Sequence, residues 1–189
     1  MESYRVDKDS LGEVKVPSNA YYGPFTVRAS NQYKVTGQKP HVNMIKAFAM
    51  IKRSAALANK NLSVLPAVKA DAIVKACDEI LCGQLLDQFI VDSINSGAGT
   101  AFNMNINEVI ANKALEITGH RIGDYSFINP NDDVNMSQSS NDTFPTAMHI
   151  AILMNMREVV DSLNSLITAF EKKAQEFKEV IKIGRTHLM

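Results

Sequence analysis

The feature that most constrains the fold is a long segment without helix-breaking residues near the C-terminal end of the chain. Neither Gly nor Pro occurs between Pro145 and Gly184. Apolar residues recur in this segment at alternating spacings of three and four, at Leu163, Leu166, Ile167, Phe170, Ala174, Phe177 and Ile181. This spacing is typical of the apolar seam of a helical bundle or coiled coil. The sequence therefore predicts one helix from about Thr143 to Ile183.

Such a helix is too long for a small domain to cover. Roughly 36 residues at about 1.5 Å each give a rod of about 54 Å, whereas a compact chain of this size has a radius of gyration of about 16 Å. A lone helix cannot bury its apolar stripe, so we expect a partner for it. That partner comes either from sequence outside this chain or from another subunit. We interpret the chain as an N-terminal fragment.

The remaining sequence predicts shorter helices after an irregular start. Pro and Gly residues interrupt the first forty residues, which predicts a small strand pair and loops, with apolar runs too brief for helices. Helices are predicted from His41 to about Asn61, from after Pro66 to about Cys82, and from Met104 to about Ile117. The predicted fold class is mainly α, with a small helical N-terminal domain over residues 1–141 and its short irregular or β start. Residues 142–189 are predicted to form the first long helix of a central helical bundle and the turn after it.

Composition excludes several classes of function. The 189 residues contain 20 basic and 20 acidic side chains without a basic block, so nucleic acid is not an expected partner. The start is charged and no apolar run reaches membrane-spanning length, so we expect no signal peptide, no membrane contact and a cytoplasmic location. Cys77 and Cys82 lack the spacing of a zinc site or redox motif and are interpreted as buried or idle thiols.

A polar loop before the long helix predicts an anion-binding site. The stretch from Asn129 to Thr146 is dense in amides and hydroxyls, and Ser139, Ser140 and Asn141 come just before the helix. Helix N-termini carry unpaired N–H groups and a positive dipole end, which suits a carboxylate ligand. A loop that needed only solubility would carry charges and Gly instead. The sequence therefore predicts a site that needs neither metal nor cofactor.

A second turn, from Gly97 to Thr100, precedes another predicted helix. It is not a dinucleotide fingerprint, because Phe102 occupies the third glycine position and no clear strand precedes it. Its plain structural interpretation is a tight turn with Thr100 as the helix cap. The amides that follow, at Asn103, Asn105 and Asn107, form either a buried network or substrate contacts.

Thr186 and His187, after the predicted long helix, complete the candidate set. Arg185, Thr186 and His187 are expected at the end of that helix, where its dipole favours a cation. A histidine there suits proton handling, or hydrogen bonding to a carboxylate or ammonium, equally well. No arrangement of Ser, His and Asp with a recognisable context indicates a nucleophile.

Four motifs together resemble one superfamily. In this order they are Gly97–Thr100, Asn103–Val109, Ser137–Asp142 and Gly184–His187. They resemble the fumarase and aspartase superfamily, in its branch of class II fumarases and aspartate ammonia-lyases. Within the branch, aspartase-like features are Ala20–Gly23, Asp87–Phe89 and Asn129, where fumarases usually carry the His of a second, non-catalytic dicarboxylate site. Ser140 is the fumarase choice, and Asp133 departs from both. The sequence is most like the aspartate ammonia-lyases.

The resemblance implies a reaction and a set of substrate-binding residues. The implied reaction is the reversible anti elimination of ammonia from L-aspartate, which gives fumarate. The implied substrate-binding residues are Thr100, Ser139, Ser140, Asn141, Thr186 and His187. The implied base is a serine on a mobile loop downstream of this chain. Its active sites form where three subunits of a homotetramer meet, so the fragment alone is expected to be inactive.

Two alternatives stay open at this point. The first is a class II fumarase, which interconverts fumarate and L-malate with water as the leaving group. The second is a catalytically silent helical assembly module, because so much of the chain is a seam-bearing helix. A module of that kind would have no use for Ser139, Ser140 and Asn141.

Overall fold

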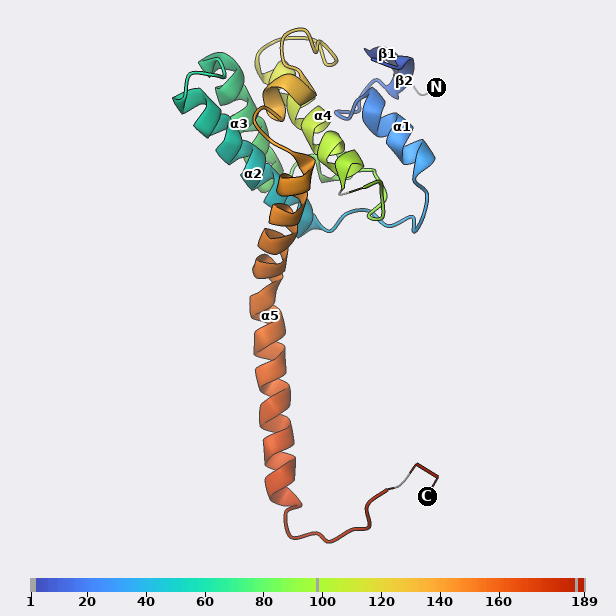
Figure 1. Cartoon of the computed structure of the whole chain (residues 1–189), viewed down its shortest axis with the longest axis vertical. Coiled ribbons are helices and arrows are strands. Elements are labelled where there is room, and N and C mark those ends of the chain that lie inside the picture. The colour runs from blue at the N-terminus through green and yellow to red at the C-terminus, as the bar shows by residue number, and fades with distance from the viewer. Residues whose placement is uncertain (1–2, 98, 186, 189) are drawn as a thin grey trace. The chain divides into compact units, whose positions relative to one another are not determined.

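The computed structural model describes residues 3–97, 99–185 and 187–188 of the chain. The chain divides into two compact units, Met1–Ala151 and Ile152–Met189. The predicted mainly α class is confirmed, because helices dominate the described residues of both units and the strands are confined to the N-terminal start (Figure 1). The units are described separately below.

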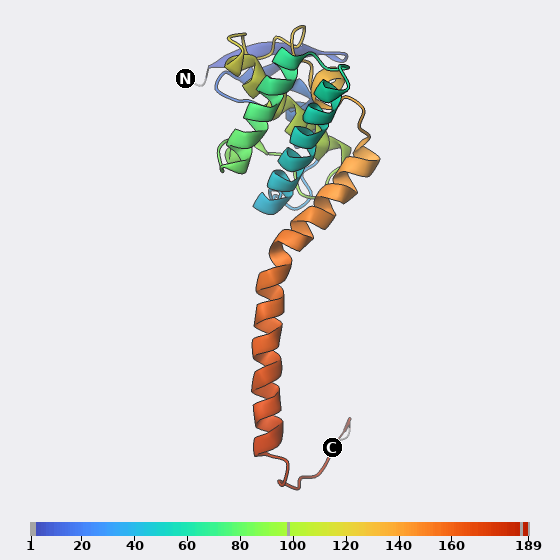
Figure 2. The same cartoon turned by 90° about the vertical axis from the view of Figure 1, so that its left-hand side faces the viewer.

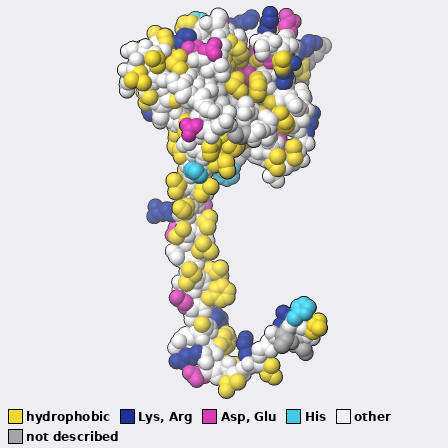
Figure 3. All heavy atoms as spheres, in the orientation of Figure 1, with side chains coloured by type: hydrophobic (Ala, Val, Ile, Leu, Met, Phe, Trp, Pro, Cys, Tyr) yellow, Lys and Arg dark blue, Asp and Glu magenta, His cyan; other side chains and the backbone are white. Residues whose placement is uncertain are grey.

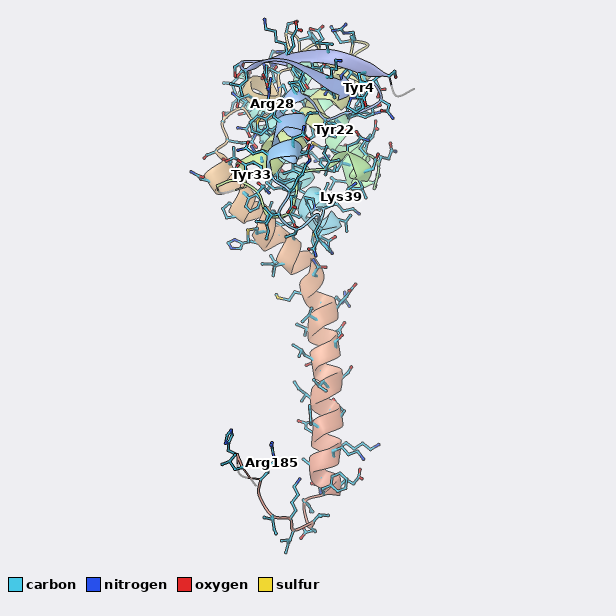
Figure 4. All side chains as sticks on the ribbon, turned by 90° about the vertical axis from the view of Figure 1, so that its right-hand side faces the viewer. Tyr4, Tyr22, Arg28, Tyr33, Lys39 and Arg185 are labelled. Carbon is cyan, nitrogen blue, oxygen red and sulfur yellow. The ribbon has the colours of Figure 1, made fainter. Side chains whose placement is uncertain are left out.

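The first unit opens with the predicted strand pair. Strands β1 (Tyr4–Asp9) and β2 (Gly12–Pro17) pair in an antiparallel register that sets Tyr4 opposite Pro17 and Asp9 opposite Gly12. Arg28, labelled in Figure 4, donates from Nε to the Asp9 carboxylate over 3.0 Å. This ion pair ties the hairpin to the helix that follows it.

That helix, α1 (Pro24–Gln32), corrects the prediction that the first forty residues hold no helix. Pro24 occupies the first turn, where its missing N–H costs nothing. The Glu108 carboxylate caps this end by accepting from the backbone N–H groups of Gly23, Phe25 and Thr26 at 2.9, 2.9 and 3.0 Å. The stabilising group thus lies more than eighty residues away in sequence, beyond the reach of any local pattern.

The core of the first unit lies among three longer helices. They are α2 (Val42–Asn61), α3 (Ala67–Leu81) and α4 (Thr100–Ile117), which lie side by side in Figures 1 and 2. Phe48 of α2 meets Phe102 of α4 edge to face, with ring centroids 5.3 Å apart. The predicted α2 and α3 are confirmed to within a residue or two, whereas α4 begins four residues before the predicted Met104. Gly83 ends α3 in the left-handed region, with φ 93°, as expected of a C-terminal cap.

Two short helical segments lie in the connections between α3 and α4 and between α4 and α5. The 3-10 turn η1 (Leu86–Gln88) follows α3, and the π-helical segment η2 (Pro130–Val134) precedes the last helix. Asn129 caps η2 by accepting from the N–H groups of Asn131 and Asp132 at 2.8 and 3.1 Å. The polar loop identified in the sequence therefore begins as a wide helical turn.

The long helix α5 (Ser140–Glu176) begins in the first unit and continues through the second. Thr143 and Ala147 are buried within the first unit. The prediction that the helix reaches Ile183 is wrong, because it ends at Glu176 and a turn follows. The final stretch contains the β-branched residues Val180, Ile181 and Ile183, which favour helices weakly.

The second unit exposes its apolar residues. Every described residue from 156 to 188 is exposed, and hydrophobic side chains run along the helix in Figure 3. Leu163, Leu166 and Ile167 are each about half exposed, and Phe170 is 68% exposed. Within the described part of the chain, no helix has the length and apolar character needed to cross a membrane.

Candidate functional site

The N-termini of α4 and α5 meet in the first unit, and glycine makes their approach possible. Gly99 caps α4 with φ 76°, in the left-handed region that favours glycine. A Cβ at this position would overlap the ring of Phe144, which lies in the first turns of α5. Gly99 thus allows the start of α5 to pack directly against the start of α4.

This approach brings together hydroxyl groups that the sequence placed forty residues apart. Thr100 Oγ1 and Ser140 Oγ lie 3.4 Å from each other. Ser139 caps α5, because its Oγ accepts from the Asn141 N–H at 3.2 Å and its carbonyl accepts from the Thr143 N–H at 2.9 Å. Thr100, Ser139 and Asn141 are exposed, and Ser140 is half-buried.

The interpretation of Thr100 as a helix cap is wrong. Gly99 takes the cap position without any side-chain hydrogen bond, and Thr100 is the first helical residue. Its hydroxyl therefore faces Ser140 instead of the backbone of its own helix. Two helix N-termini with their positive dipole ends, and hydroxyls at the surface between them, form a site suited to a carboxylate.

The asparagines that follow Thr100 form a buried network, which answers one alternative left open by the sequence. Asn103 and Asn107 donate their Nδ2 atoms to Asn135 Oδ1, over 3.1 and 3.3 Å. Asn105 instead accepts from the Ile90 N–H and donates to the Gln88 carbonyl, at 3.0 and 3.1 Å. These amides connect α4 to the neighbouring loops at residues 88–90 and at Asn135.

Sequence reasoning missed Lys52, which joins the same network. Lys52 lies on α2, is fully buried, and donates from Nζ to Asn135 Oδ1 over 2.8 Å. Burial lowers the pKa of this amine to about 7. A signal was present, because Lys52 stands four residues after Phe48 and seven before Asn59, on the buried face of the helix.

The structure brings together some of the predicted site residues but not the whole set. Thr100, Ser139, Ser140 and Asn141 cluster at the two helix starts. His187 belongs to the second unit, in the segment after α5 where Figure 4 labels Arg185. That segment begins after Glu176, so the expectation that Arg185 and His187 stand at the helix end is wrong. Thr186 lies outside the described residues.

The first unit also contains a cavity of about 470 Å³ away from these hydroxyls. It is lined by the end of β1, the start of α1, part of α4 and the segment around η2, including Lys8, Asp9, Glu108, Tyr125, Asn129 and Asp132. Burial raises the pKa of Glu108, against the N–H groups of Thr26, Phe25 and Gly23 that favour its charged form. Thr100, Ser139, Ser140 and Asn141 do not line this cavity.

The chain matches one known protein family. Residues 12–189 match a protein family described as lyases, and the chain belongs to that family. The resemblance inferred from the four motifs is thereby confirmed.

Two similar relatives bear names from the branch of aspartate ammonia-lyases and class II fumarases. The chain is 52% identical over 187 residues to the aspartate ammonia-lyase of Bacillus subtilis, covering 99% of the chain and 39% of the relative. It is 48% identical over 186 residues to the class II fumarate hydratase of Helicobacter pylori strain J99, covering 98% of the chain and 40% of the relative. The chain thus spans about two fifths of the length of these relatives.

Solved structures agree with the fold. The native-form structure described as a fumarate lyase:delta crystallin from Brucella melitensis has a TM-score of 0.87 at 50% identity, covering 99% of this chain and 44% of that one. The recombinant class II fumarase from Schistosoma mansoni has a TM-score of 0.85 at 41% identity, with coverages of 99% and 40%.

Proposed function

We propose that the full-length protein is an aspartate ammonia-lyase, which eliminates ammonia from L-aspartate reversibly to give fumarate. The observation that carries the proposal is the pairing of Thr100 and Ser140 hydroxyls where two helix N-termini meet. Helix dipoles and hydroxyl donors together match the carboxylate groups of a dicarboxylate substrate. Relatives at 45 to 52% identity bear the name aspartate ammonia-lyase, which supports this choice of reaction.

The proposed chemistry breaks one C–H bond and one C–N bond. A base removes the proton from the carbon beside a carboxylate, and negative charge then develops on the carboxylate oxygens. Collapse of that charge forms the C=C bond of fumarate and expels ammonia. Donors fixed in place before the reaction stabilise the developing charge at little reorganisation cost. The proposed donors are Thr100, Ser139, Ser140 and Asn141, together with Thr186 and His187. The proposed base is a serine downstream of this chain.

Assembly and location form part of the same proposal. We propose a homotetramer whose active sites combine residues of several subunits, and no activity for the 189-residue chain alone. Its coverage of only 39% of the Bacillus subtilis relative supports the need for further sequence. The exposed thiol of Cys82 favours a reducing compartment such as the cytoplasm.

A class II fumarase is the second candidate, and specific observations favour it. The Helicobacter pylori relative named fumarate hydratase is nearly as similar, at 48% identity. Ser140 also follows the fumarase pattern of the resemblance. Both reactions need the same carboxylate site, so the leaving group separates them.

The test is an assay of the full-length protein for fumarate by ultraviolet absorbance, with L-aspartate and L-malate offered side by side. Turnover of aspartate alone supports the proposal, turnover of malate alone supports the fumarase, and turnover of neither contradicts both. In the active enzyme, Ser140→Ala removes a hydroxyl donor and is expected to lower kcat/KM on the order of 100-fold. Thr146→Ala removes an exposed hydroxyl two turns into the same helix and is the matched control. Equal activity of the two variants would exclude Ser140 from the site.

A further inference from the structure

Lys52 is a buried lysine at a position where an apolar side chain would fill the same space. It lies on α2 between Phe48 and Ala56, both of which belong to the hydrophobic core. An amine in such surroundings is costly unless its hydrogen bonds are satisfied, and a methionine would fill a similar volume without that cost. Cys77 of α3 is the titratable neighbour whose charge would act on Lys52, and burial raises the pKa of that thiol, which stays uncharged. A lysine here calls for a specific polar partner.

That partner is Asn135, which receives three donors on a single oxygen. Lys52 Nζ, Asn103 Nδ2 and Asn107 Nδ2 all donate to Asn135 Oδ1, at 2.8, 3.1 and 3.3 Å. The shortest of these bonds comes from Lys52. Asn135 immediately follows the π-helical segment η2, so this oxygen joins α2 and α4 to the loop that leads into α5.

The other end of the Asn135 amide holds the loop. Its Nδ2 donates to the carbonyl of Gln138 over 3.0 Å, and Gln138 directly precedes Ser139. A second residue of α2, Asn59, donates to the Met136 carbonyl over 3.1 Å. Lys52 and Asn59 are seven residues apart and therefore lie on the same face of the helix. One face of α2 thus fixes the backbone from Asn135 to Gln138.

The network also reaches the first turn of α5 from the other side. The Thr143 hydroxyl has one proton and two acceptors within reach, Asn103 Oδ1 at 3.4 Å and the Ser139 carbonyl at 3.1 Å. Both Thr143 and Asn103 are buried. Polar contacts therefore run from Lys52 through Asn135 and Asn103 to Thr143, whose hydroxyl also lies within hydrogen-bond distance of the Ser139 carbonyl.

We propose that Lys52 is a positioning residue for the carboxylate site: through Asn135 it fixes the segment before α5, so that the hydroxyls of Ser139 and Ser140 stand beside Thr100. Lys52 itself is buried and acts through the loop. The effect of Lys52 on turnover rests on the proposed function of those hydroxyls. Its effect on the loop does not.

The first test replaces Lys52 in the full-length protein. Lys52→Met keeps the volume and removes the donor, and amide hydrogen exchange is then measured along the chain. Exchange is expected to accelerate in residues 135–141 while α2 and α3 remain protected. Lys60→Met is the matched control, because Lys60 lies on the same helix but pairs with Asp71 at the surface. Equal exchange in the two variants across residues 135–141 would contradict the proposal.

Kinetics separate positioning from simple loss of folded protein. Partial unfolding lowers the apparent kcat and leaves KM unchanged, whereas displaced hydroxyls weaken substrate binding and raise KM as well. Lys52→Met is expected to lower kcat/KM for L-aspartate on the order of 100-fold, with a raised KM. An unchanged KM in Lys52→Met would overturn the positioning role.

Asn135→Ala removes the acceptor of the Lys52 hydrogen bond and keeps the test decisive if Lys52→Met does not fold. It is expected to accelerate exchange over the same residues. The double variant is expected to be no worse than the poorer single variant, since both changes break one network. Fully additive losses would contradict the proposal. If the unsubstituted protein turns over neither substrate, the proposed function fails, while the exchange measurements still decide the role of Lys52.

Discussion

At the scale of single residues, Lys52 is expected to make the folding stability depend on pH. Burial lowers its pKa from 10.5 to about 7, so the unfolded chain binds more protons than the folded one between these values. Stability therefore rises with pH across this window and is lowest at and below pH 7. The expected gain is about 2 kcal/mol between pH 7 and pH 9. The Cys77 thiol beside it weakly opposes this trend as pH approaches 9, because burial raises its pKa and the unfolded chain then loses this proton before the folded one does.

Denaturant unfolding at pH 7, 8 and 9 measures this gain, with Lys52→Met as the comparison. The variant lacks the titrating amine, so its stability is expected to change much less over the same range. Parallel pH profiles for the two proteins would show that Lys52 is not the group responsible.

Residue-scale prediction succeeded where the residue type itself carries chemistry. Ser139, Ser140 and Asn141 were recognisable because hydroxyls and amides are crowded before a helix, and the structure places them at that helix start. Lys52 and Asn135 were not predicted as partners, because their pairing depends on how α2 packs against the loop 83 residues later. The proposed catalytic roles of the hydroxyls stay predictions.

At the scale of elements, α1 depends on a carboxylate from another helix. Glu108 of α4 accepts from three backbone N–H groups at the start of α1. Glu108→Gln replaces one of its two acceptor oxygens with a donor, which cannot accept from those groups. We expect a loss of about 1 to 3 kcal/mol of stability, measured by denaturant unfolding, together with faster hydrogen exchange at residues 23–32.

Glu116→Gln is the control for this substitution, because Glu116 lies on the same helix with an exposed side chain that pairs with Lys113. Its expected cost is below about 1 kcal/mol, as for surface ion pairs. If both variants lost equal stability and α1 stayed protected, the carboxylate cap would not explain α1.

The elements show why periodic helices were predictable and capped ones were not. The apolar spacing that predicted α2 and α3 is a property of each segment alone, and both helices appear where expected. For α1, the stabilising contact comes from Glu108 of another helix. The short apolar runs of the segment itself therefore did not predict a helix. The predicted end of α5 was wrong for a different reason, because the apolar spacing continues to Ile181 while the helix ends at Glu176.

For the whole molecule, the exposed apolar positions of the second unit point to assembly. Phe170 is 68% exposed, and Leu163, Leu166 and Ile167 are about half exposed at helical spacing. Side chains of this size gain about 1.5 to 3 kcal/mol each on burial, which favours covering them with other helices. The proposed homotetramer supplies such helices, as would the rest of a longer chain.

Phe170→Glu in the full-length protein distinguishes these two coverings. If other subunits cover this face, a buried carboxylate opposes association, and the variant is expected to sediment as a species smaller than the tetramer. Lys172→Glu is the control, because it changes an exposed polar position on the same helix and is expected to leave the assembly intact. If Phe170 packs only within its own subunit, Phe170→Glu lowers the folding stability of each subunit without shifting the subunit equilibrium at matched folded concentration. A tetramer that survives Phe170→Glu at low protein concentration would therefore place the subunit interface away from this face of α5.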